Sequence, residues 1–452
     1  MKILLYGINY APELTGIGKY SAELAEWLAA RGHDVSVVTA PPYYPQWRVH
    51  DGYRAGRYRK ETRAGVTVRR TPLWVPARPG GAKRLLHLAS FALSSLPSLL
   101  RAAAGRPDLI LVVEPALFCA PAAWLAARLC GARAWLHIQD YEVDAAFDLG
   151  LLKGAWLRAA VRRAERWLMR RFDRVSTISG RMLDLALYKG VEPDKAVLLP
   201  NWIDVHAIAP DRAGDLRAEL GIPADAVVAL YSGNMGGKQG LETLAQVARL
   251  LEGDERLWFV FCGQGPARAP LQAQCPGLAR VRFLDLQPAE RLAALLNTAD
   301  IHLLPQRAGA ADLVMPSKLT GMLASGRPVV CGAARGTELA GVVAHCGLVT
   351  PPEDAVAMAE AVRKLAGNAQ VRETLGAAAR RHALDHLHVD AVLAAAEREF
   401  AAVIGPARRP RRKRPMARAA TPAAEAAARY GVSSRLPAAA SLPRTRPICT
   451  AM

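Results

Sequence analysis

Short apolar runs alternate with helical segments along most of this chain, and this alternation restricts its fold more than any other feature. The first half contains such runs at residues 2–8, 34–40, 66–72, 108–114, 133–139 and 174–179. The second half contains them at residues 226–234, 257–265, 281–287, 300–306 and 327–333. Strands that are apolar on both faces and separated by helices form parallel sheets covered by those helices. The pattern predicts an α/β fold with two Rossmann-like, doubly wound parallel-sheet domains.

The length of the chain agrees with two domains, because 452 residues exceed what one ordinary core accommodates. We place the first domain at residues 1–200 and the second at residues 201–385, with the linker near residues 200–204. Helical spacing continues to residue 404, and we expect a helix over 386–404 to pack back toward the first domain. The carboxyl ends of the two sheets are expected to face a shared central cleft.

The last stretch, residues 405–452, has a different composition from the rest. It holds eleven Arg and Lys residues against one acidic residue and shows no apolar period. Such a composition predicts a disordered basic tail. The formal charge of the whole chain is +19, so the remainder is also basic. A basic protein favours anionic partners, such as phosphates, nucleic acid or an acidic membrane face.

The cysteines and apolar stretches indicate where the chain functions. Seven scattered cysteines, with no C-x-x-C, favour reduced thiols over disulfides or a zinc site. The apolar run at the start is too short for a signal peptide. The longest uncharged stretches, 85–100 and 115–127, are shorter than the roughly 20 residues of a spanning helix. We therefore expect a cytoplasmic protein with no segment that crosses a bilayer.

Two features of the first domain suggest ligand contact. Gly16 and Gly18 follow the first predicted strand and precede a helix that we expect near Lys19, so backbone amides there can point at an anion. A tight turn that only needs glycine is the alternative. His137, Gln139 and Asp140 lie at the end of the strand RAWLHIQD, where polar groups suit substrate contact, although a lone histidine is more often structural.

The second domain carries a glycine-rich turn after its first strand. Gly233 and Asn234 lead into Lys238, which we expect to open a helix and to face a diphosphate. Gly263 and Gly265 follow the next strand and permit close backbone approach to a ligand.

A second lysine occurs near a predicted helix start in the same domain. Pro316 and Ser317 suit such a start, with Ser317 as a possible cap. Lys318 then lies in the first turn, where a positive charge is unfavourable without an anion. For Lys238 the alternative is an ordinary exposed side chain at a helix start. Two lysines at helix starts in one domain favour a bound phosphate.

Some catalytic motifs are absent from the sequence, and each absence argues against one kind of site or enzyme. No D-x-D occurs, so the chain lacks that metal-chelating carboxylate pair. No G-x-x-x-x-G-K-[ST] occurs, which argues against a P-loop ATPase or kinase. No G-x-S-x-G elbow occurs, which argues against an α/β-hydrolase.

The order of these motifs resembles glycosyltransferase family 4, whose members have the GT-B fold. The resemblance runs from residue 1 to about residue 404. It rests on PELTGIGKY, LAARGHDVSVVTAPPYYPQW, LLPNWID, GNMGGKQGLETL and PSKLTGMLASGRPVV. These segments look most like the colanic-acid type of exopolysaccharide glycosyltransferases, a group that extends lipid-linked repeat units and includes an assigned fucosyltransferase.

The resemblance implies a role for each candidate residue. The first domain would bind the acceptor and the second the nucleotide-sugar donor. The implied catalytic residues are His137, Lys238 and Lys318, with His137 near the transferred sugar. The implied donor-binding residues are Gly16, Gly233, Asn234, Gly263, Gly265, Asp312 and Ser317. The implied acceptor-binding residues are Glu13, Tyr43, Tyr44 and Asp140.

The family also implies the kind of reaction. It would transfer a hexose, fucose being one possibility, from a GDP- or UDP-sugar with retention of configuration, no metal and no cofactor. The acceptor would be a saccharide linked to polyprenyl diphosphate at the inner face of the membrane. Charge stabilisation of the departing nucleotide would supply most of the catalysis.

The sequence departs from the family pattern in the second domain. Asn234 and Met235 stand where family members usually have an arginine that pairs with the lysine. Leu313 and Gly321 stand where two glutamates spaced eight apart are usual. Asp312 and Lys318 are the residues that we expect to substitute.

A basic amphipathic stretch at residues 154–175 adds a membrane hypothesis. Its arginines and apolar positions fit either an anionic lipid surface or an ordinary helix covering a sheet. The stretch 85–100, which has basic residues beside it, favours peripheral membrane attachment.

Three other functions compete with a glycosyltransferase. They are a GT-B sugar-nucleotide epimerase, a non-catalytic sugar-nucleotide-binding scaffold, and a nucleic-acid-binding protein. The low aromatic content and the concentration of charge in the tail argue against nucleic acid.

Overall fold

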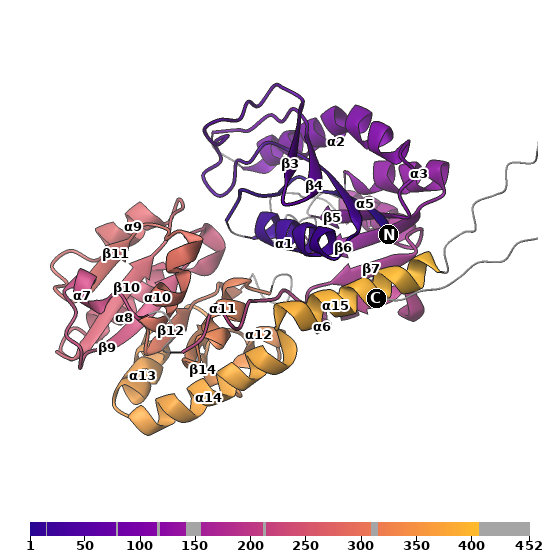
Figure 1. Ribbon diagram of the computed structural model, residues 1–452. Coiled ribbons are helices and arrows are strands. Elements are labelled where there is room, and N and C mark those ends of the chain that lie inside the picture. The colour runs from indigo at the N-terminus through magenta and orange to yellow at the C-terminus, as the bar shows by residue number, and fades with distance from the viewer. Residues whose placement is uncertain are drawn as a thin grey trace, which may run out of the picture. The chain divides into compact units, whose positions relative to one another are not determined.

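The structure of the chain is a computed structural model, and residues 1–405 belong to one unit of it. It describes residues 1–14, 16–77, 80–114, 118–141, 155–210, 214–308 and 315–405. This unit contains two separate sheets, each surrounded by helices (Figure 1). The predicted disordered tail lies outside the described residues.

The first sheet has eight strands in the order β3-β4-β2-β1-β5-β6-β7-β8. Their bounds are β1 Lys2–Tyr6, β2 Asp34–Thr39, β3 Arg59–Arg63, β4 Val66–Arg70, β5 Leu109–Glu114, β6 Arg133–Ile138, β7 Arg174–Thr177 and β8 Ala196–Leu198. All pairs are parallel except β3 with β4. The sequence did not predict β3, because its residues RKETR show no apolar face.

The second sheet has six parallel strands in the order β11-β10-β9-β12-β13-β14. Their bounds are β9 Val227–Ser232, β10 Leu257–Cys262, β11 Val281–Leu284, β12 Ile301–Leu304, β13 Val329–Gly332 and β14 Gly347–Thr350. The strand β14 was also missed, because it is short and contains a single run of Leu348 and Val349. The two parallel-sheet α/β domains confirm the predicted fold class.

The order of the strands in each sheet indicates where a ligand could bind. In the first sheet the chain winds from β1 toward β2 on one side and toward β5 on the other. In the second sheet β9 has the corresponding position, between β10 and β12. Such switch points leave a crevice beyond the carboxyl ends of the strands. The loops after β1 and β9 are the ones that carry the glycine motifs.

Helices cover both sheets. The α-helices are α1 Ile17–Ala30, α2 Gly81–Ala103, α3 Ala120–Cys130, α5 Ala155–Met169, α6 Gly180–Tyr188, α7 Arg217–Leu220, α8 Glu242–Leu250, α9 Arg268–Ala273, α10 Leu292–Asn297, α11 Lys318–Ala324, α12 Glu338–Val343, α13 Ala355–Ala366, α14 Ala369–His386 and α15 Val389–Ile404. Three short 3₁₀ helices are η1 Pro193–Lys195, η2 Gly237–Gln239 and η3 Ala289–Arg291.

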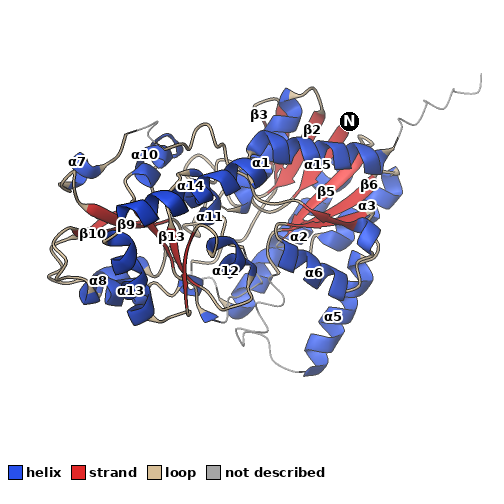
Figure 2. Cartoon of the chain, turned by 90° about the horizontal axis from the view of Figure 1, so that it is seen from below, coloured by secondary structure: helices blue, strands red, loops and turns tan. Residues whose placement is uncertain are grey.

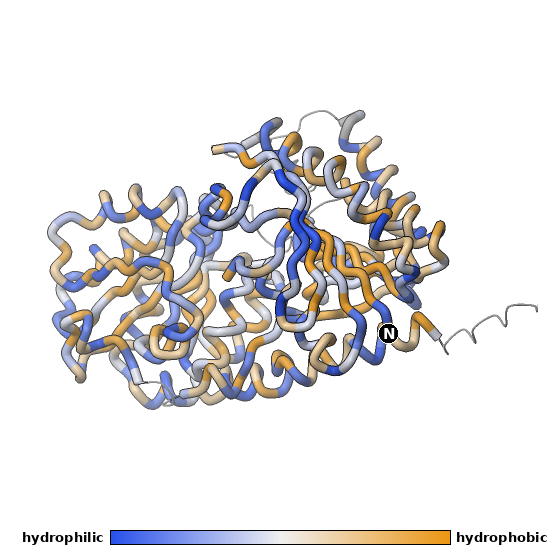
Figure 3. The backbone as a smooth tube through the Cα atoms, turned by 45° about the horizontal axis from the view of Figure 1, so that its top comes forward, coloured by the Kyte–Doolittle hydropathy of each residue, from blue (hydrophilic) through white to orange (hydrophobic). Residues whose placement is uncertain are grey.

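The alternation of side chains along β1 shows how the first sheet is buried on both faces. Leu4 and Tyr6 contribute to one apolar core, whereas Ile3 and Leu5 contribute to another on the opposite face. Figure 3 shows the strands of this sheet as mostly hydrophobic chain. Each face therefore needs its own covering helices.

The last helix, α15, packs on the core of the first sheet. The ring of Phe400 lies edge-on to that of Trp135, with 4.8 Å between centroids. On α1, the indole nitrogen of Trp27 donates to Asp390 at 3.0 Å, and Figure 2 shows the two helices beside each other. The chain reaches α15 through residues that run beside the predicted linker, since Ile203 and His388 form a parallel bridge.

Helix α2 combines a buried face with an apolar exposed one. Over Lys83–Ala103 it has the length and composition of a membrane-spanning helix, with a mean hydropathy of 1.2 and one third of that window buried. Phe91 and Leu99 pack in the first sheet's core, and the hydroxyls of Tyr6 and Ser95 are 2.6 Å apart. Packing of this kind is typical of a sheet-covering helix.

Candidate active site

A buried carboxylate organises the loops beyond β1. One oxygen of Glu13 accepts hydrogen bonds from the amides of Tyr43 and Tyr44, both at 3.0 Å. The other accepts from the side-chain amide of Asn9 at 2.9 Å. Burial raises the pKa of Glu13 to about 7, although these hydrogen bonds act to lower it. One oxygen thus holds the Tyr43–Tyr44 loop, and the other is bound by Asn9 in the loop after β1.

Gly16 and Gly18 have different reasons to be glycine. Gly16 precedes α1 with a φ of 63°, a left-handed conformation, so the helix starts at Ile17, slightly before the predicted position near Lys19. Gly18 packs against Glu13, and a Cβ there would lie 2.6 Å from a carboxylate oxygen. The loop therefore needs both residues for its shape.

Arg70, at the end of β4, is a buried cation that the sequence did not single out. Its guanidinium donates to Glu61 at 2.7 Å, to the Ala40 carbonyl at 3.0 Å and to the Ala11 carbonyl at 2.6 Å. These bonds tie the loop after β1 to the end of β2. The available signal was a pair of arginines, Arg69 and Arg70, at the end of a strand that begins with Val66.

The glycine loops of the second domain pack on each other. A Cβ on Gly263 would lie 1.9 Å from the Gly233 carbonyl oxygen, and one on Gly265 would lie 2.4 Å from that of Met235. The Met235 amide donates to the Gln264 carbonyl at 2.8 Å. The close neighbour of Gly263 and Gly265 is therefore the adjoining loop, and the predicted approach of a ligand to them stays a prediction.

Lys318 lies over this pair of loops. Its ammonium donates to the Tyr231 hydroxyl at 2.7 Å and is 4.1 Å from the centre of that ring. A Cβ on Gly233 would lie 3.5 Å from the Lys318 nitrogen, so glycine leaves room for the lysine. Burial lowers the pKa of Lys318 to about 7. Within the described part of the chain, no carboxylate forms a salt bridge with it.

Side-chain hydrogen bonds join the loops of the two domains, among them one from Gln46 to Gln264 at 3.4 Å. The side-chain amide of Asn234 donates to the Tyr44 hydroxyl at 3.0 Å, and the Tyr231 hydroxyl donates to the Asn234 carbonyl at 2.6 Å. Tyr44 also lies beside Gly16, since a Cβ there would be 3.8 Å from its ring. The chain of contacts runs from Glu13 through Tyr44, Asn234 and Tyr231 to Lys318, across both switch points.

Tyr44 lies among charged groups. Burial raises the pKa of its hydroxyl, the positive charge of Arg84 lowers it, and the carboxylates of Glu13 and Asp140 raise it further. Asp140 therefore lies within electrostatic reach of Tyr44, at the carboxyl end of β6. This places the four predicted acceptor-binding residues, Tyr43 included, around one loop.

His137 faces away from solvent inside the first domain. Its Nδ1 is 2.8 Å from the Ser176 hydroxyl, which also accepts from the Trp135 indole at 2.8 Å. Its Nε2 is 2.9 Å from the Gln139 amide nitrogen, so Nε2 accepts and Nδ1 carries the proton. Burial lowers the pKa of His137 to about 4. Its nearness to a transferred sugar stays a prediction.

Three predicted features of the second domain differ in the structure or lie outside it. Lys238 lies in the first turn of the 3₁₀ helix η2 and not at the start of an α-helix, because Gly240, with a φ of 61°, separates η2 from α8, which starts at Glu242. The side chain of Lys238 lies outside the described residues, and so does the whole of Asp312.

Ser317 precedes α11, but its side chain does not cap the helix, because its backbone is already helical. Its carbonyl accepts from the Thr320 hydroxyl at 2.9 Å.

The structure shows no candidate metal centre in the ranges that it describes, where no group of three His, Cys, Asp or Glu side chains is placed to hold an ion. The cationic and amide groups gathered at the two switch points are suited to a different ligand. Lys318 and the backbone of the glycine loops can hold a phosphate, and the Tyr43–Tyr44 loop can contact a neighbouring hydroxylated group.

Both domains match known families. Residues 15–202 match the family described as Glycosyl transferase 4-like domain, and residues 226–368 match Glycosyl transferases group 1. The chain is 49% identical over 347 residues to WcaI of Escherichia coli (strain K12), which is named as a colanic acid biosynthesis glycosyl transferase. That match covers 75% of this chain and 85% of WcaI.

Solved structures show the same fold at low identity. Sucrose-phosphate synthase from Thermosynechococcus elongatus is similar with a TM-score of 0.69 and 18% identity, covering 88% of this chain and 98% of that one. HepE of Anabaena, in complex with UDP-glucose, is similar with a TM-score of 0.64 and 15% identity, covering 88% and 99%. With its two sheets, its paired glycine loops and these matches, the chain belongs to glycosyltransferase family 4, has the GT-B fold and is a glycosyltransferase.

Proposed function

We propose that this glycosyltransferase transfers a hexose from a nucleoside diphosphate sugar to a lipid-linked saccharide during synthesis of a colanic-acid-like exopolysaccharide. The observation that supports a nucleoside diphosphate donor is the position of Lys318. Its amine is buried beside Gly233, and among the described residues no carboxylate forms a salt bridge with it. A cation in that position is stabilised by an anionic ligand such as a diphosphate. The UDP-glucose complex of HepE supports the same donor class.

The leaving nucleotide is the group on which charge develops in such a reaction. A sugar leaving its donor places negative charge on the diphosphate, and Lys318 can supply the compensating charge in a site already shaped by the glycine loops. Asn234 and Tyr44 couple that loop to the first domain, where the acceptor would bind. Transfer with retention and without a metal is part of the proposal and rests on the family resemblance.

The sugar and the acceptor come from the same resemblance. Fucose, carried by GDP, is the first candidate because the motifs of the chain look most like the colanic-acid group, to which the 49% identical relative is also assigned. A UDP-hexose is the second candidate. The acceptor would be a saccharide on polyprenyl diphosphate.

An exposed apolar surface on the first domain would suit such an acceptor. Leu86, Leu93 and Leu100, spaced seven apart on α2, are 60%, 69% and 53% exposed. On α3, which packs beside α2, Leu125 and Leu129 are 51% and 73% exposed. Lys83 and Arg101 flank the leucines of α2. We infer that these helices attach the enzyme peripherally to the anionic cytoplasmic face of the membrane.

Product analysis tests the proposal. The protein is incubated with labelled GDP-, UDP- and dTDP-sugars and a membrane extract that contains polyprenyl-linked saccharides. The proposal expects label from one donor to enter the lipid-extractable fraction as a glycoside. An altered donor sugar with no glycoside would indicate an epimerase, and donor binding with neither product would indicate a scaffold.

A further inference from the structure

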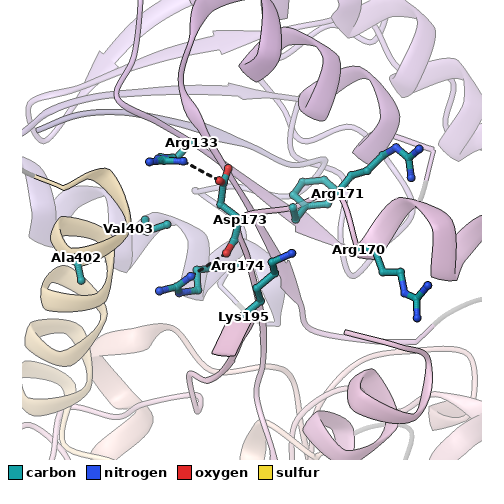
Figure 4. Close-up of a pocket in the computed structure, with 9 residues that line it drawn as sticks. Arg133, Arg170, Arg171, Asp173, Arg174, Lys195, Ala402 and Val403 are labelled. Atoms are coloured by element: carbon teal, nitrogen blue, oxygen red, sulfur yellow. Dashed lines mark hydrogen bonds and ion pairs between the residues drawn. The ribbon is translucent and has the colours of Figure 1, made fainter. Parts of the chain in front are cut away.

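A basic cavity lies at the amino ends of the strands of the first sheet. The loop of Gly16 and Gly18 lies at the other edge, beyond the carboxyl end of β1. The cavity has a volume of about 300 Å³, and its charged lining residues are Arg133, Arg170, Arg171, Asp173, Arg174 and Lys195 (Figure 4). Arg133 begins β6, Arg174 begins β7, and Lys195 directly precedes β8. All of these residues lie at or near the amino ends of parallel strands.

Its position separates this cavity from the sugar-nucleotide site. The candidate active site lies beyond the carboxyl ends of the strands, whereas the cavity lies at their amino ends. The six residues of β6 span about 20 Å at the usual rise of a strand. A donor diphosphate at Lys318 therefore does not reach the cavity.

The single acidic residue of the cavity is already engaged. The Asp173 carboxylate accepts from the Arg133 guanidinium at 3.0 Å and from the Ala134 amide at 2.8 Å. Lys195 is 2.7 Å from Glu192, a carboxylate outside the lining. Five cationic side chains against these two carboxylates leave an excess of positive charge, which is unfavourable without a counter-ion.

Two of the arginines are held in place by backbone carbonyls. The Nε of Arg170 donates to the Gly190 carbonyl at 3.0 Å. The guanidinium of Arg171 donates to the Trp167 carbonyl at 2.8 Å and lies 3.5 Å from the centre of the Trp167 ring. Among the described residues neither guanidinium makes a further hydrogen bond, so its other N–H groups can bind an anion. Fixed arginines are suited to the paired hydrogen bonds that phosphate oxygens accept.

We propose that this cavity binds the phosphate group of an anionic ligand at a second site, separate from the proposed donor site. An anionic phospholipid headgroup and a soluble diphosphate offer the same chemistry. The exposed Leu129 and Trp167, 73% and 51% accessible, belong to the helices that precede β6 and β7.

Hydrogen exchange measured by mass spectrometry tests the proposal locally. The exchange rate of peptides covering residues 170–176 and 190–196 is measured without a ligand and then in the presence of inorganic pyrophosphate, of phosphatidylglycerol vesicles or of phosphatidylcholine vesicles. We expect exchange in these peptides to slow at least threefold with pyrophosphate, with phosphatidylglycerol vesicles, or with both, and to be unchanged with phosphatidylcholine. Slowing with vesicles alone identifies a headgroup, and slowing with pyrophosphate alone identifies a soluble anion.

Variants separate this site from the candidate active site. The double variant Arg174→Gln/Lys195→Gln should lose the slowing, whereas Lys364→Gln/Arg381→Gln, which removes the same charge from exposed residues of α13 and α14, should keep it. Lys318→Ala should also keep it. Arg170→Gln, on an exposed residue of the same cavity, serves if the double variant does not fold. No slowing with either anionic probe, or equal slowing in wild type and cavity variants, would overturn the proposal.

Discussion

The Lys318 ammonium and the Tyr231 hydroxyl are 2.7 Å apart, and the lysine also lies 4.1 Å from the centre of the tyrosine ring. Tyr231 is the fifth residue of β9 and is fully buried, so it holds the amine in a fixed place at the carboxyl end of the sheet. This arrangement keeps a poorly solvated amine next to the glycine loop. Its protonation should therefore respond strongly to an anionic ligand.

The first prediction concerns the pH dependence of nucleotide binding. The pKa of Lys318 is lowered to about 7 by burial, and a bound diphosphate should raise it. Binding then takes up a proton above pH 7, so affinity should fall up to tenfold per unit of rising pH and be nearly constant below pH 7. Isothermal titration of the preferred nucleoside diphosphate between pH 6 and 9 measures this. Lys318→Met should bind weakly at every pH and show no such slope.

A second prediction concerns the bridge between the domains. Tyr44→Phe removes the acceptor of the Asn234 amide, a hydrogen bond worth about 1 kcal/mol. We expect kcat/KM for the donor to fall about fivefold, with little change in the melting temperature. Tyr58→Phe is the control, because its hydroxyl donates to the Ser94 carbonyl away from the glycine loops.

The bridge is tested more strictly by a double-mutant cycle. If Tyr44 acts through Asn234, the double variant Tyr44→Phe/Asn234→Ala should lose little more than either single variant. Additive losses would show that the two residues act independently.

Glu13 yields a prediction about stability. Its pKa is raised to about 7 in the folded chain from 4.5, so the folded state holds an extra proton between these values. Its contribution to stability is therefore complete below about pH 4.5 and is lost as pH rises through 7, a change of about 1–3 kcal/mol. Glu13→Gln should remove this part of the pH dependence, as measured by urea unfolding from pH 4.5 to 8. An unchanged pH profile would contradict the assigned protonation of Glu13.

The membrane proposal predicts a loss of vesicle binding without a loss of folding. Replacing Leu86, Leu93 and Leu100 with Gln removes the exposed stripe of α2 while its buried face stays intact. We expect flotation with anionic vesicles to fall at least tenfold. The matched control replaces Leu250, Val356 and Leu384 of the second domain, which are 49%, 60% and 42% exposed. Equal flotation of the two triple variants would refute a docking role for α2.

The sequence predicted those strands and loops that a pattern of neighbouring residues marks. The apolar runs located eleven of the strands, and the glycines after β1, β9 and β10 marked the loops of the candidate site. The strand β3 was missed because a polar edge strand has no apolar period. Similarly, the sequence could not show that Lys238 lies in the short 3₁₀ helix η2 and that Gly240, with its left-handed φ, separates η2 from α8.

Contacts between distant residues could not be predicted in the same way. Tyr44 and Asn234 are 190 positions apart, so their hydrogen bond exists only once both domains have folded. Tyr231 reads as one more apolar strand residue, and nothing local shows that its hydroxyl meets Lys318. Gly263 and Gly265 were expected to let a ligand approach the backbone, and only the structure shows that the Gly233–Met235 backbone lies against them.

The measurement that tests the account most directly is acceptor-dependent nucleotide release by wild type, Lys318→Ala and the control Lys364→Ala. The reaction contains the preferred nucleotide sugar and a membrane extract with polyprenyl-linked saccharides, at pH 7. The account predicts that wild type and Lys364→Ala release nucleotide at similar rates, whereas Lys318→Ala is slower by at least a hundredfold because the leaving diphosphate lacks its cation. Release by Lys318→Ala at the wild-type rate would contradict the assignment of this lysine to the leaving diphosphate.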